Sequence, residues 1–274
     1  MRVLRYIFQF YINSSIHVAL AVCALVGITV FEYDLVVPMA LWFFIFLSTI
    51  SGYNFVKYAK VAGLHHRSLT NSLKTIQIFS FLSLGVLCYF ALQLPWKILW
   101  TSAAFAMLTF FYAVPVLNKK NLRNFTGIKI FIVAVVWSGI SVAVPIMAAG
   151  QDYTIGFLLT FIQRFFIVIV LILPFEIRDL QYDNEALGTL PQKFGVVTAK
   201  LIGVILLVGS LVLELFKKSN GEYYFLSLIC LSFLLSFLLI FSKREQTRYY
   251  ASFWVEGVPI VWFIILCLLN HFLS

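Results

Sequence analysis

Residues 155–176 read IGFLLTFIQRFFIVIVLILPFE, and this stretch decides the fold class of the chain. Its only basic residue is Arg164, and its only acidic residue, Glu176, stands at its end. A helix needs about 20 apolar residues to cross the roughly 30 Å of hydrocarbon in a lipid bilayer. The stretch therefore predicts a membrane-spanning helix.

Eight further segments have the same length and character. They are residues 11–31, 35–53, 75–94, 97–117, 128–149, 196–216, 223–242 and 252–272. The whole chain is 62% hydrophobic and 11% charged, whereas a soluble domain carries about 25% charged residues. The sequence thus predicts an all-α polytopic membrane protein with about nine transmembrane helices, in a single domain over residues 1–274.

The basic residues predict the orientation of this bundle, because short cytoplasmic loops retain Lys and Arg. If the N-terminus is cytoplasmic, all but four of the 20 Lys and Arg residues lie inside; the exceptions are Lys97, Lys217, Lys218 and Arg164 within its span. The basic residues then serve to orient the chain and to contact anionic lipid, which explains the net charge of +9. The charge therefore does not indicate a nucleic acid partner. We expect a multi-pass protein of the bacterial inner membrane whose polar loops face the cytoplasm.

The loop after the sixth span carries two aspartates with useful spacing. If the helix continues past Glu176, Asp179 and Asp183 stand four residues apart on one helix face. Two carboxylates can hold Mg²⁺, which takes its remaining oxygens from water and phosphate, so a diphosphate substrate is indicated. The alternative interpretation is a solvated acidic loop that caps the next helix.

Residues 179–195, DLQYDNEALGTLPQKFG, resemble the second aspartate-rich motif of the UbiA family of intramembrane prenyltransferases. The segment Tyr112-Ala-Val-Pro, followed by Asn118, Lys119, Lys120 and Arg123, is similar to the family's tyrosine-proline-basic segment. The resemblance covers roughly residues 10–270 and implies nine helices around a central cavity. It also implies a Mg²⁺-dependent transfer of a prenyl group from an isoprenoid diphosphate to a lipid or aromatic acceptor.

The resemblance assigns roles to individual residues. Asp179 and Asp183 are the implied magnesium ligands and catalytic residues, and Tyr112 is a candidate for the cavity wall. Four basic residues are candidates for binding the diphosphate and for stabilising its negative charge when it leaves: Lys119, Lys120, Arg123 and Arg178.

The family's first motif, N-x-x-x-D-x-x-x-D, is incomplete in this chain. Asn54 is present, but Tyr58 and Ala62 stand where the two aspartates belong. One hypothesis is that Lys57 and Tyr58, on one flank of the helix with Asn54, contact the diphosphate in place of a metal. The alternative is a catalytically degenerate homologue that binds an isoprenoid or quinone-like lipid.

Four polar residues inside the predicted spans are further candidates, because charged groups in a bilayer face the interior of a bundle. They are Asn13, His17, Arg164 and Glu256. They could line a cavity and orient an acceptor, or form a bonded network between the first, sixth and ninth spans. A transporter is the rival from another functional class, since Arg164 and His17 could serve a substrate path.

Overall fold

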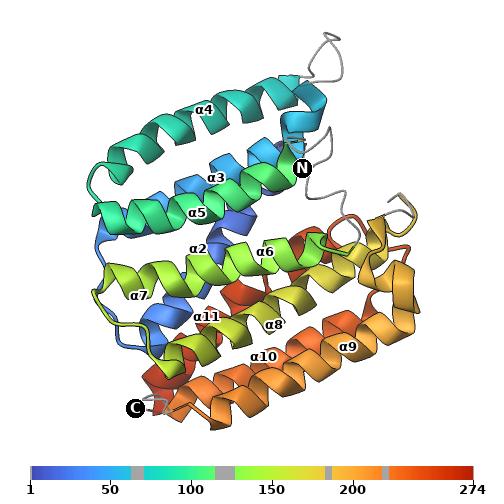
Figure 1. Ribbon diagram of the computed structural model, residues 1–274. Helices are drawn as coiled ribbons and strands as arrows, with labels where there is room; N and C mark the ends of the chain where they lie inside the picture. Colours follow the sequence, from blue (N-terminus) through green and yellow to red (C-terminus); the bar gives the residue numbers. More distant parts are fainter. Residues whose placement is uncertain (1, 63–70, 115–126, 183–186, 218–221, 274) are drawn as a thin grey trace.

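The computed structural model describes residues 2–62, 71–114, 127–182, 187–217 and 222–273, and every regular element in these ranges is a helix (Figure 1). In chain order these are α1 (Arg2–Asn13), α2 (Ile16–Glu32), α3 (Met39–Ala62), α4 (Asn71–Ala91), α5 (Trp96–Ala113), α6 (Lys129–Ser138), η2 (Gly139–Ala143), α7 (Val144–Ala148), α8 (Ile155–Asp179), α9 (Leu190–Leu215), α10 (Glu222–Phe241), η4 (Tyr250–Val255) and α11 (Val258–Leu273). The elements η2 and η4 are short π-helices. The predicted all-α fold is confirmed.

Each predicted span corresponds to a helix or to a run of helices. Among the described residues, seven stretches are long and apolar enough to cross a membrane, with α6–η2–α7 and η4–α11 each forming one stretch. The pair α1 and α2 makes an eighth if it is one bent span. The chain is thus an integral, multi-pass membrane protein. The number of nine crossings and the cytoplasmic N-terminus stay predictions.

The first predicted span, residues 11–31, is broken at Ser14 and Ser15. The two helices that flank the break are bent by 55°, and Ser15 has a φ of 64°, in the left-handed region that non-glycine residues seldom adopt. Asn54 of α3 stabilises the break, because its side chain accepts a hydrogen bond from Ser15 Oγ (2.8 Å) and donates one to the Ser14 carbonyl (3.0 Å). The prediction of one continuous helix was wrong, since hydropathy does not report a bend that another helix stabilises.

Helix α8 lies at the centre of the bundle. Its residues 167–171 are all buried, as expected for a helix that is apolar on every side. It packs against α6 and α9. In Figure 1, α3, α4 and α5 lie on one side of the bundle and α8 to α11 on the other, with α2 and α6 between them.

Helix α8 ends at Asp179, and a turn follows in which the Tyr182 amide donates to the Asp179 carbonyl at 2.9 Å. The described part of α8 thus ends at Asp179. Asp183 lies outside the described residues, so the shared face expected for the two aspartates stays a prediction.

The next helix, α9, begins at Leu190, earlier than the predicted span of residues 196–216. Thr189 and Gln192 form a capping box at the start of α9, in which the Gln192 side chain accepts from the Thr189 amide at 2.9 Å. Pro191 occupies the first turn, where its missing amide proton costs nothing. The helix is kinked at Gly195, whose φ is 81°, so the capped start and the long remainder of α9 run in different directions.

Candidate active site

A polar cavity of about 210 Å³ lies at the end of the bundle where α8 ends and α6 begins. Its walls come from α3, α5, α6, α8 and the start of the last span. The polar side chains among them are Tyr53, Tyr112, Lys129, Glu176, Asp179 and Glu256. Sequence analysis identified Tyr112, Asp179 and Glu256 as candidates, and the structure brings these three to one cavity.

An apolar cavity of about 580 Å³ adjoins the polar one. It lies among α2, α3, α4, α5, α6 and η2. Its walls are rich in aromatic side chains, namely Phe44, Tyr53, Phe55, Phe105, Phe110 and Trp137. A cavity of this size and lining suits a hydrocarbon chain rather than a polar solute.

Tyr53 and Trp137 line both cavities and therefore mark their junction. The Trp137 indole Nε1 donates a hydrogen bond to the Tyr53 hydroxyl at 2.8 Å. The bond satisfies the indole N–H of Trp137, which is buried, while Tyr53 is partly buried. A molecule with a charged head and an apolar tail could thus occupy both cavities across this pair.

The polar cavity carries more negative than positive charge. Glu176 is buried and its carboxylate lies 4.0 Å from Lys129 Nζ. Asp179 accepts a hydrogen bond from Arg178 Nε at 2.8 Å, and both of these side chains are partly exposed. With Glu256, three carboxylates face one lysine on the cavity wall.

This donor set fits a magnesium ion that is shared with a phosphate. Carboxylate oxygens are the ligands that Mg²⁺ prefers, and one or two of them suffice when phosphate oxygens complete the coordination. Among the residues that the structure describes, no group of three or more His, Cys, Asp or Glu side chains could hold a metal alone. The described carboxylates on this wall are Glu176, Asp179 and Glu256.

Of the basic candidates, the structure describes Arg178. Lys119, Lys120 and Arg123 lie outside the described residues, as does Asp183. Arg178 is at the last turn of α8, where it pairs with Asp179 and lies over the ring of Phe175 at 5.2 Å.

The residues of the incomplete first motif fasten the break between α1 and α2. The Lys57 ammonium and the Tyr58 hydroxyl both donate to the Asn13 carbonyl, at 3.2 and 3.0 Å. Asn54 is buried and also donates to Ser80 Oγ at 2.8 Å. None of Asn54, Lys57 and Tyr58 is on the wall of either cavity described above.

His17 is buried beside the last span and uses both ring nitrogens. Nε2 lies 3.0 Å from the Phe253 carbonyl and Nδ1 lies 2.8 Å from the Tyr11 hydroxyl. Because a carbonyl only accepts, Nε2 carries the proton and Nδ1 accepts from Tyr11. The break at Ser14 and Ser15 separates His17, in α2, from Asn13, the last residue of α1.

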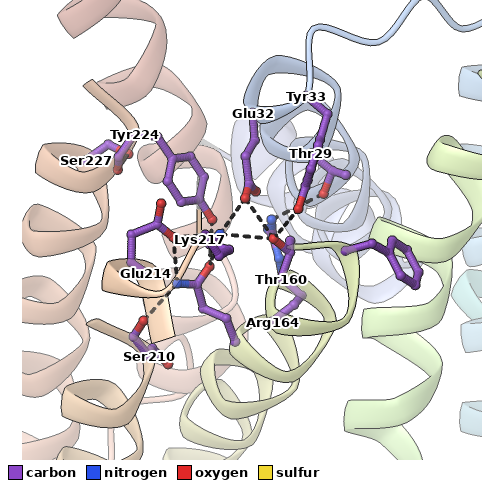
Figure 2. Close-up of polar contacts among 12 residues, drawn as sticks. Thr29, Glu32, Tyr33, Thr160, Arg164, Ser210, Glu214, Lys217, Tyr224 and Ser227 are labelled. Atoms are coloured by element: carbon purple, nitrogen blue, oxygen red, sulfur yellow. Dashed lines mark hydrogen bonds and ion pairs between the residues drawn. The ribbon is translucent and has the colours of Figure 1, made fainter. Parts of the chain in front are cut away.

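Arg164 lies in a buried polar network at the opposite end of the bundle, shown in Figure 2, and lines neither cavity. The centre of the network is Lys217, whose ammonium lies 2.5 Å from Glu32 and 2.6 Å from Glu214. The guanidinium of Arg164 donates to Thr29 Oγ1 at 3.3 Å and lies 4.8 Å from the Trp262 ring centre.

Hydroxyl and amide groups complete this network. Thr160 donates to Glu32 at 2.8 Å, and Gln163 donates to Glu214 at 3.1 Å and accepts from Tyr224 at 2.9 Å. Two carboxylates and two cations balance in charge, so the network links α2, α8, α9, α10 and α11 without a net buried charge.

Sequence analysis missed several residues of the cavities. Glu176 and Lys129 were visible only as ends of spans, and Tyr53 lay beside the incomplete motif. No local signal pairs Tyr53 with Trp137, because the two are far apart in the chain. Only the packing of α3 against the other helices places them together.

Known structures share this arrangement of helices. A UbiA homologue from Aeropyrum pernix K1 matches over 93% of this chain and 98% of its own, with a TM-score of 0.66 at 11% identity. A UbiA homologue from Archaeoglobus fulgidus bound to DMAPP and Mg²⁺ matches over 96% and 99%, with a TM-score of 0.64 at 10% identity. A digeranylgeranylglyceryl phosphate synthase matches over 98% and 97%, with a TM-score of 0.56 at 16% identity.

Sequence comparison gives no such match: no family model fits the chain, and no curated protein is significantly similar to it. The structural matches nevertheless extend over nearly the whole length of this chain and of each matched chain. The sequence resemblance and the structural similarity agree, and the chain has the UbiA fold.

Proposed function

We propose that this protein is a UbiA-type membrane prenyltransferase. It moves a prenyl group from an isoprenoid diphosphate to a hydrophobic acceptor, with Mg²⁺ held by Asp179 together with Asp183. The observation that carries the proposal is the pair of adjoining cavities, one polar and one apolar, that meet at Tyr53 and Trp137. Their chemistry matches the two ends of a prenyl diphosphate.

Each cavity suits one part of the substrate. The diphosphate, with its magnesium, lies beside Asp179 and within reach of Lys129 in the polar cavity. The prenyl tail extends past Trp137 into the apolar cavity. Bound Mg²⁺ neutralises the diphosphate and makes it a better leaving group.

The membrane environment is part of the proposal. The polar cavity opens on the side where α6 begins and α8 ends, which the distribution of Lys and Arg assigns to the cytoplasm. We place the protein in the inner membrane of a bacterium, with its diphosphate supplied from the cytoplasm and its acceptor from the lipid phase.

A direct test measures release of diphosphate from labelled geranylgeranyl diphosphate by the purified protein in the presence of Mg²⁺. The parent protein is expected to bind the substrate and release diphosphate, and Asp179→Ala is expected to lose Mg²⁺-dependent binding. Glu245→Gln serves as the control, because it removes an exposed carboxylate that lies on neither cavity wall. No Mg²⁺-dependent binding by the parent would remove the proposal.

A second candidate function follows from the incomplete first motif. Tyr58 and Ala62 stand where the family's first motif has its two aspartates. The polar residues of this segment, Asn54, Lys57 and Tyr58, are bonded to residues 13–15 and 80. A homologue that binds an isoprenoid lipid without turnover would keep both cavities. Binding without release of diphosphate in the same assay would favour this alternative.

A further inference from the structure

Glu256 directly follows a short π-helix in the last predicted span. The π-helix η4 ends just before it, and the Glu256 amide donates to the Ala251 carbonyl, five residues earlier, at 3.0 Å. The following helix, α11, begins at Val258 with Pro259 in its first turn. Such π-helical turns are frequent at functional sites because they re-aim a side chain, and here Glu256 is on the wall of the polar cavity.

The Glu256 carboxylate has no hydrogen bond and no ion pair within 4 Å to any residue in the described part of the chain. In the described part of the chain, the nearby cations Lys57 and Arg178 are engaged elsewhere. Lys57 donates to the Asn13 carbonyl, and Arg178 pairs with Asp179. Glu256 therefore faces the cavity with its hydrogen-bonding capacity unused.

A carboxylate inside a membrane span is costly, and such residues mark the path of a ligand or a proton. The acidic side chains of the cavity limit which ligand groups can lie beside Glu256. Glu176 and Asp179 make this cavity acidic, and the proposed diphosphate enters it only with Mg²⁺, so a further anionic group beside Glu256 is disfavoured. A group that donates a hydrogen bond, such as a hydroxyl, fits an unpaired carboxylate.

We propose that Glu256 binds the hydroxyl of the acceptor and takes its proton during transfer, an inference that rests on the proposed function. The C1–O bond of the prenyl diphosphate breaks, and its electron pair leaves with the diphosphate. The acceptor oxygen, or a ring carbon activated by the hydroxyl, forms the new bond to C1. The proton that the acceptor loses passes to the Glu256 carboxylate, so that charge and atoms balance.

The experiment compares the parent protein with Glu256→Gln, Glu256→Asp and the control Glu245→Gln. Glutamine keeps the shape of the side chain but cannot accept the proton, whereas aspartate keeps the carboxylate. The donor probe is labelled geranylgeranyl diphosphate with Mg²⁺. The acceptor probes are a monoalkyl glycerol and a long-chain alkylphenol, which distinguish an alcohol from a phenol.

Three readings are taken from each protein: binding of the donor, transfer of label, and binding of the alkylphenol alone, followed through Trp137 fluorescence. Glu256→Gln should bind the donor as the parent does but transfer at least about 100-fold more slowly, the effect of losing a general base. It should also bind the alkylphenol about tenfold more weakly, because a hydrogen bond to a charged group is lost. Glu256→Asp should keep part of the transfer rate, and Glu245→Gln all of it.

The inference is overturned if Glu256→Gln transfers as fast as the parent, if it binds the alkylphenol equally well, or if the parent transfers to neither hydroxyl probe. These outcomes differ from failure of the proposed function, which appears as absence of Mg²⁺-dependent donor binding by the parent. Donor binding by Glu256→Gln also shows that this variant is folded.

Discussion

The Trp137 indole of α6 donates a hydrogen bond to the Tyr53 hydroxyl of α3, at 2.8 Å, at the point where the polar and the apolar cavity meet. Tyr53 belongs to α3, on one side of the bundle, and Trp137 belongs to α6, which lies between the two sides. A prenyl diphosphate that spans both cavities would lie against these two rings.

Removing the Tyr53 hydroxyl should destabilise the protein. In Tyr53→Phe, the Trp137 Nε1–H loses its acceptor in a largely apolar setting, which costs about 1–3 kcal/mol. The thermal unfolding midpoint in detergent should fall, and Tyr89→Phe should leave it unchanged, because Tyr89 is exposed on α4. An unchanged midpoint for Tyr53→Phe would mean that the bond contributes nothing to stability.

Breaking the network around Lys217 should destabilise the protein more than Tyr53→Phe does. Lys217→Met leaves Glu32 and Glu214 buried without the cation that lies 2.5 and 2.6 Å from them. Removing one partner of a buried ion pair costs about 3–5 kcal/mol. Unfolding should therefore occur at a clearly lower temperature, while Lys97→Met, at an exposed lysine, serves as the matched control.

A compensating variant separates lost charge balance from lost packing. Changing Glu214 to Gln in the Lys217→Met background leaves one carboxylate, Glu32, and one cation, Arg164, so charge balance is restored and part of the stability should return. If the double variant is no more stable than Lys217→Met alone, charge balance is not what the network contributes.

The bend between α1 and α2 should depend on Asn54. Asn54→Ala removes the hydrogen bonds to Ser14, Ser15 and Ser80, each worth about 1 kcal/mol. We expect a lower unfolding temperature and faster protease cleavage between α1 and α2. Gln93→Ala, at an exposed position, should change neither. Equal cleavage rates for the Asn54 variant and the parent would contradict this role.

Sequence alone predicts much of the fold, because apolar length and turn residues are local signals. The stretch at 155–176 and its eight counterparts all form helices. The break at Ser14 and Ser15 was missed, since it depends on Asn54 from another helix. Helix α8 extends beyond the predicted span of residues 155–176 and ends at Asp179, because apolar length shows which residues lie in the bilayer and not where a helix stops.

The candidate site was predicted only in part. Asp179, Tyr112 and Glu256 lie on one cavity because the helices that carry them converge there. Arg164 was recognised as a buried charge, but its partners Thr29 and Trp262 belong to helices far away in the chain. Such pairings follow from three-dimensional packing and leave no periodic pattern in the sequence.

The central claim is that one amphiphile occupies both cavities, and Gly52 offers the most direct test of it. Gly52 is on the wall of the apolar cavity, and a Cβ atom there would meet no atom within 4 Å. A side chain at this position therefore starts without a clash at Cβ, and the ring of Gly52→Phe takes up space in the cavity. Gly85 on α4 is equally open but lines neither cavity, so Gly85→Phe is the matched control.

The decisive measurement is Mg²⁺-dependent binding of geranylgeranyl diphosphate and dimethylallyl diphosphate to these two variants and the parent. The account predicts that Gly52→Phe binds the long-chain diphosphate at least about tenfold more weakly, roughly 1.4 kcal/mol, and the short one normally, while Gly85→Phe resembles the parent. Unchanged binding of the long-chain diphosphate by Gly52→Phe would contradict it.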